Sequence, residues 1–293
     1  MKLLLIGATS FIGNKIYKFA KHRNFDVIGT SSKYGTEYVK FDLLKDSIST
    51  ALKGDKKQTG EKYAIITAFF TGHERIISQL KKSRLINIGN SIKLMHDLTE
   101  MGYKILYFST EQVFSGNKGT SYVEDDLVDP VLEYGRQKAE IENYITSYFP
   151  DVLVYRLSQV IGDSPEGNHI WHDVYESHIQ NKSVYCIKGQ VLCPTYLDDV
   201  VKYALLGLEK DLKGIYHMAN PFSMSRYELS KLLLDRLKSN VEIKEAEQEF
   251  FKFSEPRPLN TSLDISKFSK MMGDKFVSMD ELADIFIENS LSK

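Results

Sequence analysis

The chain has 293 residues, of which 42% are hydrophobic and 26% charged, and its formal net charge is −1. A chain of this length can bury a large core in one or two domains, and its balanced charge gives no electrostatic basis for binding nucleic acid or an anionic membrane. The apolar run at the N-terminus stops at Gly7, too early for a signal peptide or a membrane span, so we expect a cytoplasmic globular protein.

Short apolar runs alternate with longer helical patterns through the first two-thirds of the chain, which is typical of a parallel sheet with crossover helices. The predicted strands are apolar on both faces, as in a covered sheet, and comprise Lys2–Ile6, Asp26–Gly29, Val39–Phe41, Tyr63–Thr67, Lys104–Phe108 and Val152–Arg156. Apolar residues at helical spacing predict helices at Phe11–Lys21, Ile77–Gly102 and Tyr134–Tyr148. The sequence therefore predicts an α/β protein with a Rossmann-type, doubly wound parallel sheet.

The rhythm of the elements changes after Ile161. Residues 162–168 are rich in turn formers, and the elements that follow are irregularly spaced: strands at Ser183–Ile187 and Gly214–Ala219, and helices at Leu197–Leu208 and Ser225–Leu237. We predict a dinucleotide-binding domain at 1–160 and a smaller region at 161–293 that mainly binds substrate and is interleaved with the first domain. The two cysteines, Cys186 and Cys193, have no metal-binding spacing, so no metal site is predicted.

A glycine-containing turn follows the first predicted strand. Gly7 and Gly13 bracket the residues Ala8, Thr9, Ser10, Phe11 and Ile12, and Ser10 stands where a middle glycine is common. Small residues there let backbone N–H groups approach a dinucleotide pyrophosphate at the positive end of the first helix. A glycine pair alone is also explained by a plain tight turn, but its place at the start of an alternating chain favours a cofactor site.

The residues after the second predicted strand indicate which dinucleotide is bound. NAD-selective sites usually place a carboxylate there, whereas this chain has Ser31, Ser32 and Lys33, with no carboxylate before Glu37. Hydroxyl groups and a cation suit a 2′-phosphate, so NADP(H) is favoured and NAD(H) is the alternative. The structural alternative is an ordinary polar loop.

The third predicted strand is followed by Asp42 and Leu43. Asp42 is a candidate to bind the adenine amino group or to cap the next helix.

Tyr134 and Lys138 are separated by four positions, so both side chains share one helix face. The same spacing occurs at Tyr17/Lys21 and at Tyr227/Lys231, which shows that spacing alone means little. Context separates the three pairs, because only Tyr134 opens a helix that comes after a strand ending in Ser109 and Thr110. The pair at 134 and 138 is therefore the candidate for chemistry.

Together these motifs resemble the extended short-chain dehydrogenase/reductase family, and within it the dTDP-4-dehydrorhamnose reductases and related sugar-nucleotide reductases. The resemblance covers essentially the whole chain and is carried by Gly7–Gly13, Ser109–Gly116, Tyr134–Lys138, Cys193–Asp199, Gly214–His217 and Arg257–Asp264.

The resemblance implies a nucleotide-linked keto sugar as substrate and a homodimer as the assembly. It assigns proton donation to Tyr134, binding of the nicotinamide ribose to Lys138, and a hydrogen bond to the substrate carbonyl oxygen to Thr110. It places Ala68, Phe69 and Asn87 at the cofactor. The implied substrate contacts are Glu111, Gln112, Asn168, Arg257 and Asn260, of which the last three have a structural alternative as loop or surface residues.

Two departures from the family pattern follow Thr110. The reductases usually carry Asp and Tyr where this chain has Glu111 and Gln112, which leaves the sugar open. Nucleotide-sugar dehydratases carry an acidic pair there, and because Gln112 cannot ionise, dehydration is disfavoured. The alternatives to a reductase are a sugar-nucleotide epimerase of the same family and a non-catalytic NADP-binding regulatory subunit, like that of methionine adenosyltransferase.

Overall fold

The computed structural model describes residues 2–33, 37–52, 60–273 and 275–291. Its internal contacts divide the chain into two units. Unit 1 comprises Met1–Ser109, Glu133–Tyr155 and Val201–Ile215, and unit 2 comprises Thr110–Leu132, Arg156–Val200 and Tyr216–Lys293. This division differs from a single boundary near residue 160, because the chain passes between the units several times.

A seven-stranded sheet forms the centre of unit 1, in the order β11-β6-β5-β4-β1-β2-β3. Its strands are β1 (Lys2–Ile6), β2 (Asp26–Ser31), β3 (Val39–Lys40), β4 (Lys62–Ile66), β5 (Tyr103–Thr110), β6 (Leu153–Leu157) and β11 (Gly214–Met218). β1 pairs in parallel with both β2 and β4, so the winding direction reverses at β1. The predicted Rossmann-type sheet is confirmed, and ligands bind such sheets beside the carboxyl ends of the strands where the order reverses.

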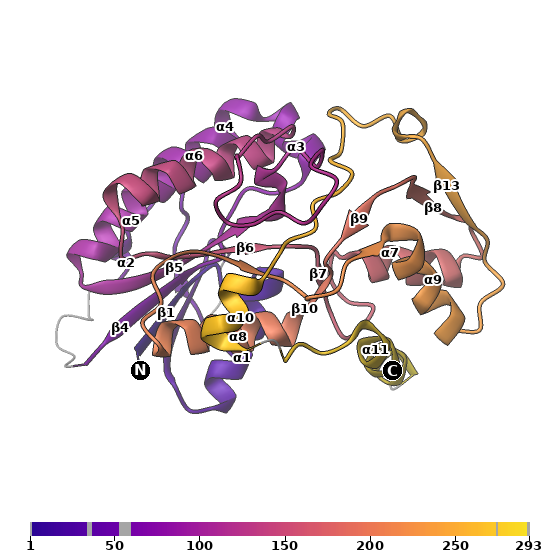
Figure 1. Cartoon of the computed structure of the whole chain (residues 1–293). Helices are drawn as coiled ribbons and strands as arrows, with labels where there is room; N and C mark the ends of the chain where they lie inside the picture. The colour runs from indigo at the N-terminus through magenta and orange to yellow at the C-terminus, as the bar shows by residue number, and fades with distance from the viewer. Residues whose placement is uncertain (1, 34–36, 53–59, 274, 292–293) are drawn as a thin grey trace. The chain divides into compact units, whose positions relative to one another are not determined.

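Helices cover both faces of this sheet. α5 (Ser91–Glu100) and α6 (Glu133–Tyr148) lie on one face, while α1 (Phe11–His22) and α8 (Leu197–Glu209) lie on the other (Figure 1). Alternate strand residues point to opposite faces, so Leu4 and Ile66 pack with Leu98 of α5 and Ile141 of α6 in a buried core. The continuous apolar strands thus result from burial on both sides.

The segment predicted as one helix over Ile77–Gly102 comprises four successive helical elements. They are α3 (His73–Ser78), α4 (Leu80–Arg84), a π-helix at Leu85–Asn90, and α5. The break between α3 and α4 falls at Gln79, whose φ of −128° is not helical. Helical backbone then continues from Leu80 to Glu100, so the predicted helix is interrupted only at Gln79. Periodicity did not reveal its π-helical turn, a feature that is frequent at functional sites.

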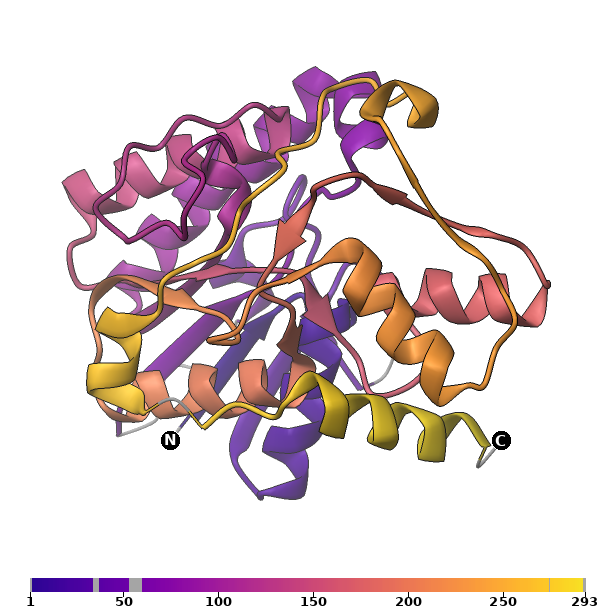
Figure 2. The same cartoon turned by 45° about the vertical axis from the view of Figure 1, so that its right-hand side comes forward.

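Unit 2 is built from short strands and separate helices. α9 (Arg226–Arg236) contacts both α7 (Ile170–Ile179) and α11 (Met279–Leu291), as can be followed in Figure 2. The strand pairs are β8 (Val184–Ile187) with β13 (Ile243–Ala246), β7 (Val160–Ile161) with β10 (Thr195–Tyr196), and β9 (Val191–Leu192) with β12 (Met224–Ser225). The remaining elements of the chain are α2 (Ile48–Ala51), α10 (Ser266–Met272) and 3-10 turns at Glu111–Val113 and Gln248–Phe251.

Local sequence explains one of these helices well. α9 begins with a capping box, in which Ser225 and Glu228 exchange side-chain to backbone hydrogen bonds. Across the described ranges no helix is both long and apolar enough to cross a membrane. The same residues contain no cluster of three or more His, Cys, Asp or Glu side chains that could hold a metal ion.

Candidate functional site

The turn between β1 and α1 is shaped by its two glycines. Gly7 has a φ of 91°, which glycine adopts readily. A Cβ on Gly13 would meet the Gly7 carbonyl oxygen and lie 2.6 Å from Thr67 Oγ1. Ser10 caps the twelve-residue helix α1 by accepting a hydrogen bond from Gly13 N at 3.1 Å. The backbone is therefore bare at the positive end of a helix, which fits the pyrophosphate of a dinucleotide.

Hydroxyl groups gather where β2 ends. Ser31 is the last residue of β2 and is buried, so it belongs to the strand rather than to the following loop. Its Oγ lies 3.3 Å from Thr9 Oγ1 of the glycine turn and accepts a hydrogen bond from Lys33 N at 3.1 Å. Ser32 and Lys33 are exposed. Two hydroxyls and an accessible ammonium thus stand at the carboxyl end of β2, beside the glycine turn.

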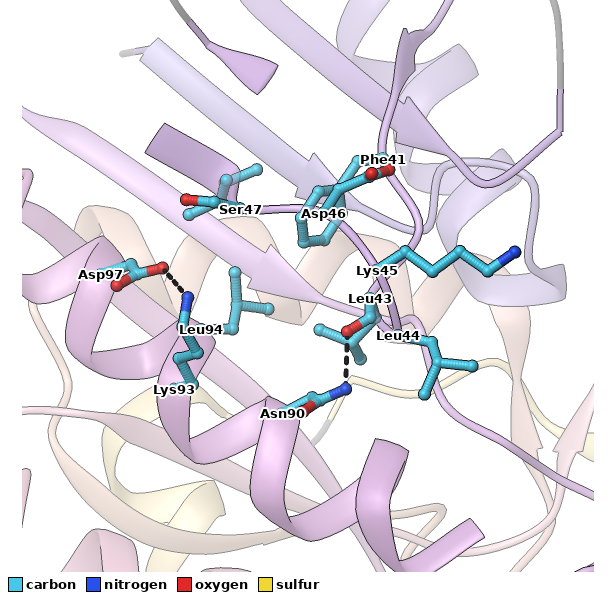
Figure 3. Close-up of a pocket in the computed structure, with 11 residues that line it drawn as sticks. Phe41, Leu43, Leu44, Lys45, Asp46, Ser47, Asn90, Lys93, Leu94 and Asp97 are labelled. Atoms are coloured by element: carbon cyan, nitrogen blue, oxygen red, sulfur yellow. Dashed lines mark hydrogen bonds and ion pairs between the residues drawn. The ribbon is translucent and has the colours of Figure 1, made fainter. Parts of the chain in front are cut away.

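Asp42 closes a local turn after β3. Its Oδ1 accepts a hydrogen bond from Leu44 N at 2.9 Å, while its own N–H donates to Asp46 Oδ2 at 2.7 Å. These bonds hold a local turn at residues 42–46, whereas the N-cap of the next helix, α2, is Ser47 rather than Asp42. Leu43 lines a neighbouring cavity of about 230 Å³ between this loop and α5, and Asn90 Nδ2 donates to its carbonyl oxygen at 2.9 Å (Figure 3).

Asn87, in the π-helix, connects the segment after β4 to α6. Its Oδ1 accepts a hydrogen bond from Phe70 N at 2.7 Å, and its Nδ2 donates to Phe70 O at 2.9 Å and to Gln137 Oε1 at 2.8 Å. Gln137 in turn donates to Ser83 Oγ at 3.0 Å. The amide of Asn87 therefore fixes the chain beside Ala68 and Phe69. Sequence reasoning missed Gln137, although it lies within the Tyr134–Lys138 motif.

Tyr134 and Lys138 lie one turn apart on α6, and Lys138 is almost completely buried, with 2% of its surface exposed. Lys138 Nζ donates to Phe108 O at 2.7 Å and to Tyr107 Oη at 3.2 Å. It also lies 3.1 Å from the ring centroid of Phe69 and 5.7 Å from that of Tyr134. Burial holds the pKa of Lys138 well below its usual range.

Unit 1 therefore brings several predicted residues together. Lys138, Tyr134 and Phe69 form one cluster at the carboxyl ends of β4 and β5, and Gly7, Thr9, Gly13 and Ser31 form another around the turn after β1. Thr67, which follows β4, donates to Gly7 O at 3.0 Å. Both clusters thus belong to the edge of the sheet at which parallel α/β proteins bind their ligands.

Thr110 and Glu111 form a buried polar group in unit 2. Thr110 caps the 3-10 turn by accepting a hydrogen bond from Gln112 N at 3.3 Å, and its hydroxyl donates to Glu111 Oε2 at 3.1 Å. Gln159 Nε2 approaches Glu111 Oε1 at 3.5 Å. Burial raises the pKa of Glu111 to about 7. Gln159 is a second residue that the sequence analysis missed.

The remaining predicted substrate residues lie on two separate segments of unit 2. Asn168 is exposed on the loop before α7. The guanidinium of Arg257 stacks on the Phe253 ring at 4.3 Å from its centroid. The backbone of Arg257 is clamped by Gln248, which accepts from its N–H at 2.7 Å and donates to its carbonyl oxygen at 3.0 Å. The planar guanidinium is thereby held on a fixed backbone.

Asn260 follows on the same segment as Arg257. Its Oδ1 accepts hydrogen bonds from Ser262 N and Ser262 Oγ, at 3.1 and 2.7 Å. The Asn260 N–H donates to Gly116 O at 3.2 Å, and a Cβ on Gly116 would lie 2.8 Å from Leu259 N. These contacts support the structural alternative for the amide oxygen of Asn260.

Comparison with known proteins finds one matching family and relatives along most of the chain. The family profile described as RmlD substrate binding domain matches residues 1–290. Methionine adenosyltransferase 2 subunit beta of Xenopus tropicalis is 26% identical over 277 residues, which cover 92% of this chain and 82% of that protein. The dTDP-4-dehydrorhamnose reductase of Aggregatibacter actinomycetemcomitans is 22% identical over 286 residues, which cover 93% of each chain.

A solved structure supports the same fold. The crystal structure of dTDP-4-dehydrorhamnose reductase from Bacillus anthracis in complex with NADP has a TM-score of 0.86 and 19% sequence identity. The superposition covers 99% of this chain and 100% of that one. The match thus spans both units, and at this identity it establishes the fold.

Proposed function

The chain belongs to the RmlD substrate-binding domain family, and on this premise we propose that it is an NADPH-dependent reductase of a nucleotide-linked keto sugar. The observation that carries the proposal is the cluster on α6, where the buried ammonium of Lys138 lies within one helical turn of the half-buried Tyr134. A half-buried phenol beside a buried ammonium at the ligand-binding edge of a Rossmann-type sheet is suited to moving a proton to a carbonyl oxygen.

The residues around the glycine turn suit NADP(H). Gly7, Thr9, Ser10, Phe11, Ile12 and Gly13 would hold the pyrophosphate, and Ser31, Ser32 and Lys33 the 2′-phosphate. Leu43 would lie against the adenine, with Ala68, Phe69 and Asn87 nearer the nicotinamide. The bound cofactor supplies the hydride. The NADP complex of the Bacillus anthracis relative supports this choice.

Two side chains contact the substrate oxygen in this proposal, and a third positions the cofactor. Tyr134 donates its phenolic proton to that oxygen, and Thr110 fixes the oxygen with a hydrogen bond. Lys138 binds the nicotinamide ribose and so orients the ring. Glu111, Gln112, Asn168 and Asn260 would contact the sugar. Arg257 would contact the diphosphate, because its planar fork can bind two oxygens.

The test is NADPH oxidation across keto sugar nucleotides with different nucleotides and sugars. Tyr134→Phe should lower kcat about 10²- to 10⁴-fold, the usual contribution of a positioned acid, and leave NADPH binding within a few-fold of wild type. Tyr227→Phe is the matched control, because Tyr227 and Lys231 have the same spacing on α9 of unit 2. Full activity of Tyr134→Phe would rule out the assigned role.

A second candidate is a regulatory subunit that binds NADP without turnover. It is favoured by the relationship to methionine adenosyltransferase 2 subunit beta. Tight NADPH binding without oxidation on any keto sugar nucleotide would select it. An epimerase would convert the sugar with no net NADPH consumption. The homodimer is tested by the mass of the protein in solution.

A further inference from the structure

The hydroxyl group of Thr110 donates its proton to Glu111. A hydroxyl has one proton to donate and two lone pairs to accept with. In this structure Thr110 Oγ1 donates to Glu111 Oε2 at 3.1 Å and accepts from Gln112 N at 3.3 Å. A substrate carbonyl oxygen needs a donor, so Thr110 can serve it only after its proton is released from Glu111.

Uncharged groups surround the Glu111 carboxyl. Thr110 and Gln112 face it from its own segment, and Gln159 faces it from the segment between β6 and β7. The titratable neighbour that the described chain brings to it is Cys193, from the segment between β9 and β10, and burial raises the pKa of that thiol to about 11. The thiol is thus neutral in the physiological range. With 3% of Glu111 exposed, burial raises its pKa to about 7.

We propose that Glu111 is a positioning residue that controls which way the Thr110 hydroxyl donates. As a carboxylate, Glu111 accepts the Thr110 proton in a hydrogen bond and keeps it from the substrate. As a carboxylic acid, Glu111 donates to the free lone pair of Thr110 Oγ1, while the other lone pair still accepts from Gln112 N. The Thr110 proton then points to the substrate oxygen. The inference rests on the proposed reductase function, in which Thr110 contacts that oxygen.

Beyond any contact of Glu111 with the sugar, this role makes the reaction depend on the protonation of a residue that acts through Thr110. In the reductase resemblance an Asp stands at this position, whereas in this chain a Glu carboxyl accepts the Thr110 proton at 3.1 Å. The expected signature is a change in the pH dependence of turnover with NADPH binding unchanged. A residue that only supports the fold would lower activity equally at every pH.

The experiment measures kcat/KM for NADPH oxidation between about pH 6 and about pH 9, with NADPH affinity measured alongside by fluorescence. Wild-type kcat/KM should fall about tenfold per pH unit above the pKa of Glu111. Glu111→Gln cannot ionise, and its amide N–H still donates to Thr110 Oγ1, so this fall should disappear. Glu124→Gln is the matched control. Glu124 is a half-buried carboxylate of unit 2 that accepts from His217 N at 2.8 Å, and its variant should keep the wild-type profile.

A second variant tests the same inference if Glu111→Gln folds poorly. Gln159→Met removes a donor that stabilises the carboxylate, so the fall in kcat/KM should move to higher pH. Infrared spectra of the protein alone should also show a protonated carboxyl band that titrates near pH 7 and is missing from Glu111→Gln. A normal fall in kcat/KM in active Glu111→Gln, or an unmoved fall in Gln159→Met, overturns the inference and leaves the reductase standing. Absence of turnover by the wild type at every pH overturns both.

Discussion

The two units each bury one ionisable side chain near the end of β5, and they do so with opposite chemistry. In unit 1 the ammonium of Lys138 meets a carbonyl oxygen, a phenol and an aromatic face. In unit 2 the carboxyl of Glu111 meets hydroxyl and amide donors. Burial lowers the pKa of the lysine and raises that of the glutamate, so both are pushed toward the neutral form. The comparison teaches that burial, more than pairing with an opposite charge, sets the pKa of both groups.

The largest expected effect concerns the glycine turn of unit 1. In Gly13→Ala the new Cβ would meet the Gly7 carbonyl oxygen and lie 2.7 Å from Ser10 Oγ, so the turn must deform. NADPH affinity measured by fluorescence titration should fall by about a hundredfold or more, equivalent to roughly 3 kcal/mol. Gly89→Ala is the control, because its Cβ would only touch Leu85 Cδ1 at 3.6 Å. Equal losses of NADPH affinity in both variants would argue against the glycine turn as the pyrophosphate site.

A second effect isolates the buried carboxyl of unit 2. Because the pKa of Glu111 is raised from 4.5 to about 7 on folding, the native state binds a proton more tightly than the unfolded chain. Its contribution to the free energy of unfolding is therefore full below the unfolded pKa and is lost as pH rises to about 7, up to roughly 3 kcal/mol. Urea unfolding across that pH window should show a decline in wild type that Glu111→Gln lacks. If the free energy of unfolding of wild type and of Glu111→Gln changed in parallel with pH, the raised pKa of Glu111 would be wrong.

A smaller effect tests the scaffold of unit 1. Asn87→Ala leaves the buried N–H and carbonyl of Phe70 without their partner, so the free energy of unfolding should fall by about 2 kcal/mol. Asn90→Ala, which removes one half-buried hydrogen bond to Leu43 O, should cost about 1 kcal/mol or less. Urea unfolding measures both. If the two variants lost the same stability, the π-helix would not depend on the amide of Asn87.

The sequence predicted the sheet of unit 1 better than the elements of unit 2. Strands covered on both faces are nearly continuous apolar runs, so β1, β4, β5 and β6 stood out within a residue or two of their observed bounds. In unit 2, β8 and α9 were predicted, whereas α7, β13, α10 and α11 were missed. α10, for example, has seven residues and packs into the core through Phe268, which gives too short a pattern to recognise.

Part of the candidate site was also readable from the sequence. Local motifs marked Gly7, Gly13, Tyr134 and Lys138 because the two residues of each pair lie within one turn or one helix. Contacts between distant segments left no local signal. Neither the hydrogen bond from Asn87 to Gln137 nor the approach of Gln159 to Glu111 follows from spacing, since the partners are 50 and 48 residues apart. The roles given to these residues remain predictions.

The two cysteines give the protein a practical property. Cys186 and Cys193 are both buried and free, and burial raises the pKa of each thiol. Since only the thiolate attacks alkylating dyes, the native chain should stay unlabelled under ordinary maleimide conditions. A single cysteine introduced on an exposed helical surface would then carry the whole fluorescent signal, without first removing the natural ones.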